Sequence, residues 1–211
     1  MLIYRFLDKN AALATIKDRE LRISRISNLN DPFEFLCVDI SDRKFRQGIY
    51  RAKARLDKTK GLICFSKNWS NPLLWGHYAE KHKGLCLAFK VNVMESYVNP
   101  VQYIERRLPR PTTKSLDFAK QILFTKFSHW SYEQEVRMYI NLEKERDGHY
   151  YLSFSNSLQL NKVIIGCESD ATVKEIEGAL GDLKNSVEVL KARPAFKEFK
   201  VVRNRKEDKY P

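Results

Sequence analysis

Two glutamates and an arginine at alternate positions are the residues whose types and spacing most directly suggest chemistry. From Tyr132 onward the sequence alternates polar and apolar residues, which predicts a strand. Glu133, Glu135 and Arg137 then lie on one face of that strand. Neighbouring carboxylates repel each other, which raises the pKa of one of them, while a nearby arginine counteracts the effect. The pattern fits either a pair of acid–base carboxylates or a solvent-facing strand with Glu and Arg partners.

The middle of the chain predicts two buried strands with a short helix between them. Residues 62–65 form a short apolar run typical of a central strand, and Ser66 should lie at its carboxyl end. Asn71 followed by proline predicts the start of a helix, and Gly84 predicts its end. A returning strand is expected at 85–89, where apolar residues alternate.

Aromatic rings and polar tips gather around this predicted helix start: Trp69, Trp75, His77 and Tyr78. A helix start offers free backbone N–H groups, and a strand end that faces one commonly binds a small anionic ligand. An aromatic-rich core segment explains the same residues without a ligand.

The formal net charge of +12 favours polyanionic partners such as nucleic acid. Residues 42–56 predict an amphipathic helix with a strongly basic outer face, and residues 101–113 predict a strand followed by an irregular basic loop. A solvated helix face is the alternative to a phosphate-contacting surface. The residues predicted to contact nucleic acid are Arg43, Lys44, Arg46, Arg51, Lys53, Arg106, Arg107 and Arg110.

The cysteines and histidines lack the spacing of a metal site. The four cysteines lie far apart with no CxxC pair, which argues against zinc and against a disulfide framework. His77, Glu80 and His82 do not match HExxH, because histidines five residues apart do not stack on one helix face. We therefore predict no metal ligands. A metal-dependent nuclease that uses His77, Glu80 and His82 ranks third among the functional interpretations.

Length and composition predict one α+β domain over residues 1–211, with a mixed or antiparallel sheet core, flanking helices and a frayed basic tail at 202–211. The first residues lack the apolar length of a signal peptide, and no run approaches a membrane span, so we expect a reduced, cytoplasmic protein.

Several further elements are expected from local signals. Asn10 is a candidate cap for a helix that ends near Glu20, Ser115–Phe127 is expected to be helical with Phe127 inward, and Ser169 or Asp170 is expected to cap a later helix. In the NDPFEF segment, Phe33 and Phe35 are expected to lie in the core. Asp31 and Glu34 are expected to form a turn or a cap, and the alternative is that they are carboxylates of a functional site.

The order of Arg5, Ser66 and the two glutamates resembles the signature of the ADP-ribosyltransferases. That signature has a basic residue on the first strand, a serine at a middle strand end, and a late E-x-E strand. More narrowly, most of the chain resembles the domain-of-unknown-function family numbered 2971, which occurs in bacteria and phages. The motifs that carry this narrower likeness are NDPFE at 30–34, CFS at 64–66, WGHYAEKHKGLCL at 75–87 and W-x-YE-x-E-x-R at 130–137.

The resemblance implies an ADP-ribosyltransferase-like fold and NAD as substrate. Cleavage of the bond between nicotinamide and ribose passes through an oxocarbenium-like transition state, which the carboxylate of Glu135 would stabilise. Glu133 would position or deprotonate the acceptor. Cofactor-binding roles are implied for four residues: Arg5 at the pyrophosphate, Ser66 at the nicotinamide-side ribose, and Tyr78 or Trp75 against nicotinamide. Orientation of Glu135 is the alternative role for Ser66.

The middle motif reads CFSKN and departs from the Ser-Thr-Ser pattern of the transferases, and Arg5 could instead pair with Glu34. The leading interpretation is an enzyme of ADP-ribosyltransferase or NAD glycohydrolase type. It would act on nucleic acid or protein, as a toxin or in phage defence or counter-defence, with an antitoxin or immunity partner as a candidate. The second interpretation is a non-enzymatic module that binds DNA or RNA.

Overall fold

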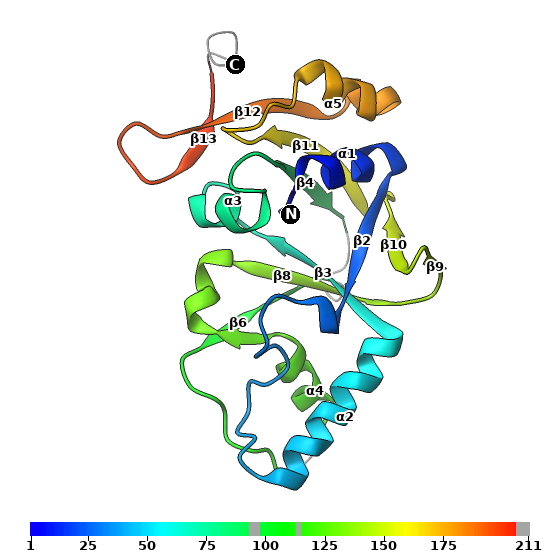
Figure 1. The fold of residues 1–211 in the computed structure, drawn as a ribbon, viewed down its shortest axis with the longest axis vertical. Coiled ribbons are helices and arrows are strands. Elements are labelled where there is room, and N and C mark those ends of the chain that lie inside the picture. The colour runs from blue at the N-terminus through cyan, green and yellow to red at the C-terminus, as the bar shows by residue number, and fades with distance from the viewer. Residues whose placement is uncertain (93–97, 113–114, 206–211) are drawn as a thin grey trace. The chain divides into compact units, whose positions relative to one another are not determined.

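The computed structural model describes residues 1–92, 98–112 and 115–205, and its main chain forms two compact units (Figure 1). Unit 1 comprises Met1–Leu21, Phe65–Met94 and Leu152–Pro211, and unit 2 comprises Arg22–Cys64 and Glu95–Tyr151. The predicted α+β class is confirmed: the sheet is mixed and mostly antiparallel, and several helices accompany it. The helices of the described residues fall short of the length and apolar character that a membrane span requires.

Unit 1 contains five strands in the order β13-β12-β11-β4-β1. The pairs β1–β4 and β4–β11 are antiparallel, whereas β11 and β12 run parallel. The carboxyl end of β3 (Lys60–Ser66) joins β1 through Tyr4 and Ser66. The bounds of these strands are β1 Leu2–Leu7, β4 Leu85–Val91, β11 Leu158–Ile165, β12 Glu188–Pro194 and β13 Val201–Arg203.

The helices of unit 1 are α1 Lys9–Asp18, α3 Pro72–Tyr78, α5 Val173–Leu180 and the 3-10 helix η4 Gly181–Asn185. Asn71 caps α3 with Pro72 at its start, as predicted. The other two predicted caps are wrong. Asp8 rather than Asn10 caps α1, and Thr172 rather than Ser169 or Asp170 caps α5, because these side chains accept the free N–H groups of the first turns.

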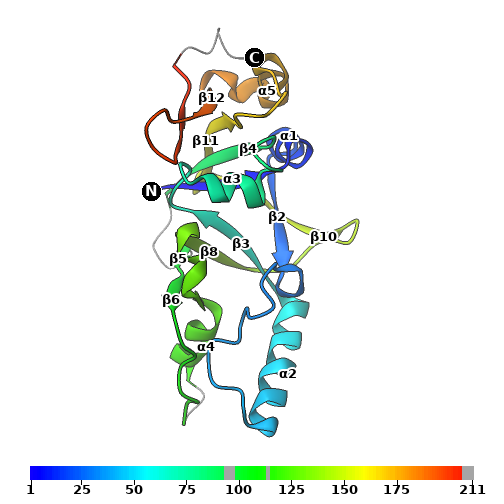
Figure 2. The ribbon, with the colours of Figure 1, turned by 60° about the vertical axis from the view of Figure 1, so that its left-hand side comes forward.

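Unit 2 is built around β3, which pairs with β2 and β8. Strand β8 also pairs with β5 (Figure 2), while β6 and β7 form a separate parallel pair and β9 pairs with β10. The bounds are β2 Glu20–Arg25, β3 Lys60–Ser66, β5 Val98–Pro100, β6 Gln102–Ile104, β7 Thr125–Phe127, β8 Glu135–Asn141, β9 Glu145–Arg146 and β10 His149–Ser153.

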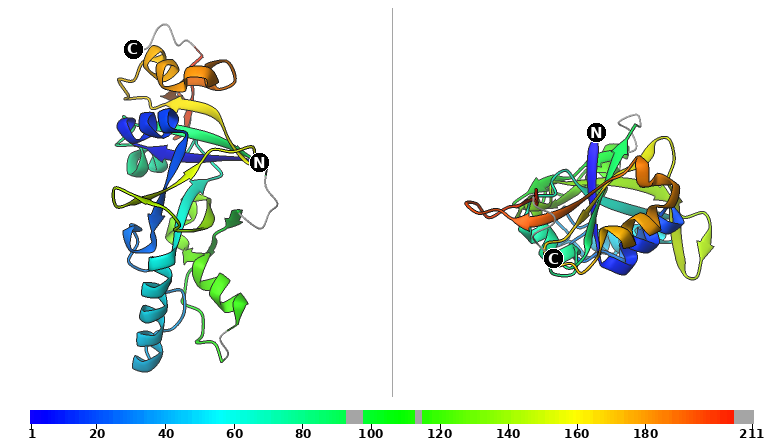
Figure 3. Two further views of the ribbon diagram at one scale, coloured as in Figure 1. Left: turned by 90° about the vertical axis from the view of Figure 1, so that its right-hand side faces the viewer. Right: turned by 90° about the horizontal axis from the view of Figure 1, so that it is seen from above.

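The helices of unit 2 are α2 Arg43–Thr59, α4 Leu116–Leu123, and the 3-10 helices η1 Ile26–Asn28 and η3 Ser128–Glu133. In the left view of Figure 3, α2 is the long cyan helix and α4 the green one. Helix α2 is confirmed, with Asp42 as its cap. The predicted helix 115–127 is too long: it ends at Leu123, and the chain turns into β7, whose Phe127 is 43% exposed.

Three other expectations have mixed outcomes. Phe35 is buried as predicted, but Phe33 is 60% exposed, because the turn begun by Asp31 directs the two rings differently. Residues 202 and 203 of the predicted tail belong to β13. Residues 206–211 of that tail, and Thr113 at the end of the predicted basic loop, lie outside the described residues.

Gly84 does not end α3, which stops at Tyr78; the following turn passes through Glu80, Lys81 and His82, all with positive φ. Glycine is required at position 84 for a reason other than ending a helix. A Cβ there would lie 2.1 Å from the backbone oxygen of Leu7, so the start of β4 tolerates only glycine at this point.

We therefore expect Gly84→Ala to lower the free energy of unfolding by about 3 kcal/mol, the upper end for overpacking. The control is Gly178→Ala, because a Cβ at this position in α5 meets nothing within 4 Å and alanine is the better helix former. Denaturant unfolding of both variants tests this, and equal stabilities would show that the backbone at Gly84 can move away.

Candidate functional site

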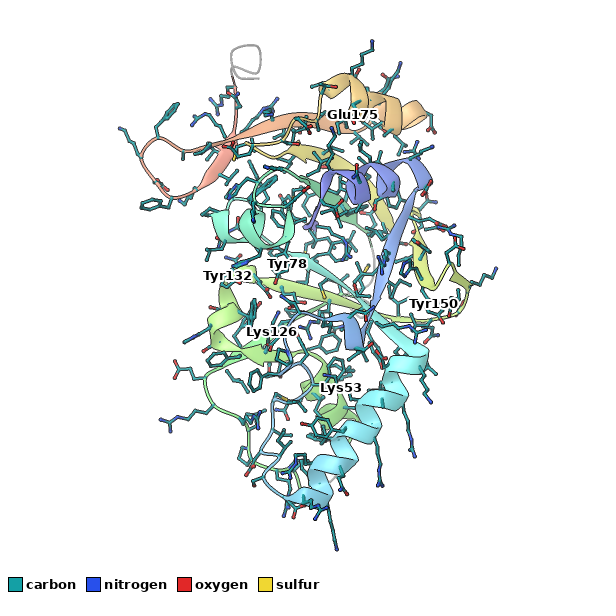
Figure 4. All side chains as sticks on the ribbon, viewed as in Figure 1. Lys53, Tyr78, Lys126, Tyr132, Tyr150 and Glu175 are labelled. Carbon is teal, nitrogen blue, oxygen red and sulfur yellow. The ribbon has the colours of Figure 1, made fainter. Side chains whose placement is uncertain are left out.

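Five charged side chains form a buried group in unit 2, named here the unit 2 ion cluster: Glu34, Lys126, Glu133, Glu135 and Arg137. Arg137 is 0% exposed and Glu34 only 2%, although charged side chains are almost never fully buried without partners. Figure 4 labels Lys126 among the side chains of this unit. The contacts within the cluster therefore determine what these groups can do.

The guanidinium of Arg137 lies between two carboxylates. Its Nη2 and Nη1 donate to Glu34 Oε1 and Oε2 at 2.6 and 2.9 Å. Its Nε and Nη2 donate to Glu135 Oε1 and Oε2 at 2.8 and 3.0 Å. A further bond runs from Nη1 to the carbonyl oxygen of Leu123 at 2.9 Å. These five bonds use all five N–H donors that a guanidinium has.

Lys126 is the second cation of the cluster. Its Nζ donates to Glu133 Oε2 at 2.7 Å and lies 3.5 Å from both Glu135 Oε2 and Glu34 Oε1. The ring of Trp130 lies under the same ammonium group, with its centroid 4.6 Å away. Both glutamates of the E-x-E motif are thus brought to one lysine.

Burial and pairing act in opposite directions on these groups. For Glu135, burial alone raises the pKa, but Arg137, Lys126 and a hydrogen bond with Cys64 outweigh it, and the pKa is lowered. For Lys126, burial lowers the pKa, but Glu135, Glu133 and Glu34 outweigh it and raise the pKa above its usual range. The carboxylate of Glu135 is therefore held as an anion at neutral pH.

Tyr103 borders the cluster from β6. Its hydroxyl accepts a hydrogen bond from the backbone N–H of Glu135 at 2.8 Å. Burial first, and then the charges of Glu135 and Glu133, raise the pKa of Tyr103 to about 12. The phenol is therefore a neutral group beside the carboxylates at physiological pH.

The predicted strand from Tyr132 is wrong at its beginning. Glu133 ends η3, Gln134 adopts a left-handed conformation with φ of 45°, and β8 begins only at Glu135. Glu135 and Arg137 do share one strand face, as predicted, because both enter the cluster from alternate positions of β8. Glu133 reaches the same lysine from the preceding turn.

Sequence reasoning missed part of this cluster. Lys126 and Tyr103 carried no local signal, because Lys126 fell within a predicted helix and Tyr103 within an unremarkable strand. Glu34 was expected in a turn or cap, with a site carboxylate as the alternative. Glu34 does lie in the turn, since its N–H donates to the carbonyl of Asp31 at 3.1 Å, and its carboxylate also pairs with Arg137 and Lys126.

The predicted NAD-binding residues lie in unit 1, whereas the glutamates lie in unit 2. Arg5 is half-buried on β1. The hydroxyl of Ser66 closes a turn, since it donates to the carbonyl of Asn68 at 2.9 Å and accepts from the N–H of Asn68 at 3.0 Å. This turn fixes the end of β3.

Trp75 is fully buried in unit 1, while Tyr78 is half-buried. The indole N–H of Trp75 donates to the carbonyl of Trp69 at 2.6 Å, and its ring packs edge-on against Phe6 with centroids 5.2 Å apart. The imidazole of His82 lies nearly parallel to Trp75 at 6.4 Å. In this structure Trp75 is therefore a core packing residue.

The seven basic residues of α2 differ in what they contact. Four exposed side chains follow one stripe of the helix, because their spacing of seven, four and three residues returns to the same face. We name them the α2 basic face: Lys44, Arg51, Arg55 and Lys58. Within the described residues these four cations make no salt bridge. The sequence predicted nucleic-acid contacts for Lys44 and Arg51. The helical spacing of the basic residues is the signal that adds Arg55 and Lys58.

Two other basic residues of α2 serve local structure. Arg46 Nη1 donates to the carbonyls of Ile40 and Ser41 at 2.7 and 2.9 Å. Lys53 Nζ donates to the carbonyl of Glu34 at 2.9 Å and lies 5.7 Å from the ring centroid of Phe35. Their charges are therefore already engaged, whereas Arg43 is exposed like the α2 basic face.

The basic loop after β6 places arginines near aromatic rings of unit 2. Arg107 lies over the exposed ring of Phe33 at 5.7 Å, and Arg110 lies over Phe45 at 5.9 Å. Arg110 also pairs with Asp42 at 3.7 Å, and Arg106 is exposed. The loop is attached to the segment before α2 because the N–H of Leu108 donates to the carbonyl of Cys37 and its carbonyl accepts from the N–H of Asp39, both at 2.8 Å.

Across the described residues, no three His, Cys, Asp or Glu side chains are grouped so as to hold a metal ion. His77 is exposed on α3 and Glu80 is exposed in the turn that follows it. Comparisons of the chain with protein-family models, with curated proteins and with solved structures found no match.

Replacement of Arg137 by methionine should lower the free energy of unfolding by about 3–5 kcal/mol, because it leaves two buried carboxylates without their main cation. The control is Arg203→Met, which removes an exposed pair with Glu188 and should cost at most about 1 kcal/mol.

The pH dependence separates this electrostatic explanation from a loss of packing. In the unaltered protein, the lowered pKa of Glu135 contributes stability that is present above its ordinary value of 4.5 and is lost as the pH falls through the folded-state pKa. In Arg137→Met, the largest influence that lowers the pKa of Glu135 is gone, so this pKa rises relative to the unaltered protein and the stability difference between the two proteins should shrink in acid. A difference that stays constant from neutral pH to the lowest pH at which both proteins remain folded would contradict the role of charge.

Proposed function

We propose that the protein binds nucleic acid through a basic surface of unit 2, formed by the α2 basic face and the arginine loop at 105–110. The observation that carries this proposal is the stripe of four exposed cations on α2 without salt-bridge partners in the described part of the chain. Phosphate backbones carry closely spaced negative charges, and such a stripe releases their counterions on binding.

The physical chemistry of α2 supports this proposal. Its 17 residues include seven arginines and lysines and one aspartate, Asp57, whose carboxylate accepts the N–H of Ser27. Like charges four residues apart, such as Arg51 and Arg55, destabilise an isolated helix. An approaching phosphate relieves this repulsion, so binding of a polyanion and stability of the helix are coupled.

Two exposed aromatic rings of unit 2 favour contacts with bases as well as phosphates. Phe33 is 60% exposed beside Arg107, and Tyr50 is 48% exposed on α2. Stacking on such rings is common in proteins that bind single strands and depends little on sequence. We therefore expect single-stranded DNA or RNA to bind at least as well as a duplex.

The double variant Arg51→Ala/Arg55→Ala should bind nucleic acid more weakly and with a shallower dependence on salt. Each phosphate contact removed lowers the slope of log affinity against log salt by roughly 0.7–0.9. Fluorescence anisotropy with labelled single-stranded DNA, single-stranded RNA and duplex DNA over a range of salt measures both quantities.

The control variant is Lys174→Ala/Lys184→Ala, which removes the same charge from exposed positions of unit 1. Equal weakening in the two double variants would show a response to net charge alone and would count against a surface on α2. No binding by the unaltered protein at low salt would refute the proposal.

The second candidate is transfer of ADP-ribose from NAD, as an enzyme with an ADP-ribosyltransferase-like fold. The observation that favours it is the meeting of Glu133 and Glu135 at Lys126, with Glu135 ionised. An anionic Glu135 suits stabilisation of an oxocarbenium-like transition state, and Glu133 would act on the acceptor. It ranks second because the oxygens of Glu135 already bind Arg137. The cofactor-binding roles of Arg5, Ser66, Trp75 and Tyr78 remain predictions from the sequence.

This candidate predicts release of nicotinamide or transfer of label when the protein is incubated with labelled NAD and with nucleic acid or protein acceptors. Glu135→Gln should lower the rate at least about 100-fold, because the neutral amide stabilises positive charge poorly. Thermal unfolding of the same variant checks that the ion cluster still folds. A rate that Glu135→Gln leaves unchanged would exclude a catalytic role for this carboxylate.

A further inference from the structure

An apolar groove with a volume of about 270 Å³ lies between α2 and α4 in unit 2. Its volume falls just below the range of about 300–1,000 Å³ typical of sites for drug-sized ligands, so it suits a smaller molecule. The groove is almost entirely apolar, and its main lining side chains are Phe35, Phe45, Ile49, Leu56, Phe118 and Ile122.

Small residues keep this groove open on the side of α2. A Cβ added at Gly48 would meet nothing within 4 Å, although glycine in the middle of a helix is less stable than alanine by roughly 0.5–1 kcal/mol. Ala52 of α2 and Ala119 of α4 also line the groove. These three small residues therefore leave the walls of the groove without large side chains at their positions.

Cations stand at the opening of the groove. Lys44 lines it, and a shallow second hollow lined by Arg51 and Arg55 shares Gly48, Ala52 and Leu56 with it. No acidic side chain lines either hollow among the described residues. Lys53 also lines the groove, but its ammonium group already donates to the carbonyl of Glu34. The free positive charge is thus concentrated on the α2 side.

We propose that this groove binds an amphipathic anion, namely a medium-chain acyl carboxylate. The alkyl chain lies between α2 and α4, where apolar burial drives binding, and the carboxylate pairs with Arg51 or Arg55 at the opening. A nucleobase fits the groove less well, because its polar edges need hydrogen-bond partners and the walls are nearly all apolar. This inference does not depend on nucleic-acid binding and is tested without nucleic acid.

The test is isothermal titration of the full chain with a series of linear carboxylates from hexanoate to dodecanoate, below their micellar concentrations. The affinity should rise roughly three- to four-fold for each added methylene until the groove is filled. The alkanol of the same length should bind roughly five-fold more weakly or worse, because it lacks the charge-assisted contact. An affinity independent of chain length, or equal affinity for the alkanol, would overturn the proposal.

Three variants locate the site. Gly48→Phe places a ring in the groove and should reduce the affinity about ten-fold or more, because it displaces the chain. Gly178→Phe, at an equally open helical glycine of unit 1, should bind like the unaltered protein. Arg51→Ala/Arg55→Ala should lower the affinity for carboxylate toward that for the alkanol.

Thermal unfolding shows whether Gly48→Phe is folded, and the smaller change Ala52→Leu narrows the same groove if it is not. Unchanged carboxylate binding in a folded groove variant would place the ligand elsewhere and overturn the proposal. Sedimentation velocity adds a further check: self-association abolished by Gly48→Phe would show that a second copy of the chain occupies the groove, and this would also overturn it.

Discussion

The guanidinium of Arg137, held between the carboxylates of Glu34 and Glu135, is the interaction on which the rest of unit 2 depends. Removing these charges from water is costly, and the loss is recovered only when every donor and acceptor is paired. The three groups that Arg137 binds belong to the loop before α2, to the end of α4 and to the start of β8. One side chain therefore fixes the mutual position of a loop, a helix and a strand.

Local periodicity was enough to predict β3, α2, the start of α3 and the shared face of Glu135 and Arg137, because each depends on nearby residues. It failed where distant contacts decide the structure. Lys126 was placed in a helix because nothing adjacent reveals that its partners include Glu34, far earlier in the chain. The left-handed turn at Gln134, which moves Glu133 out of the strand, likewise has no signal in the residue types around it.

The two faces of α2 show how residues of one type acquire different roles. Arg46 and Lys53 bind backbone carbonyls, while Lys44 and Arg51 remain exposed, although all four look equivalent in the sequence. Because the apolar face of α2 is packed against the rest of unit 2, the cations that border this face, Arg46 and Lys53, lie within reach of backbone carbonyls. The charge available to a ligand is thus smaller than the composition suggests, and it is gathered on one stripe beside the groove.

The separation between Glu34 and Arg137 has a consequence for the kinetics of folding. The two residues are 103 positions apart, so their contact closes a long loop whose conformational entropy must be lost before any bond forms. Until then both groups remain hydrated and gain little from proximity. We expect the ion cluster to form late, after β3 and β8 have paired, and to govern how slowly unit 2 unfolds rather than how quickly it folds.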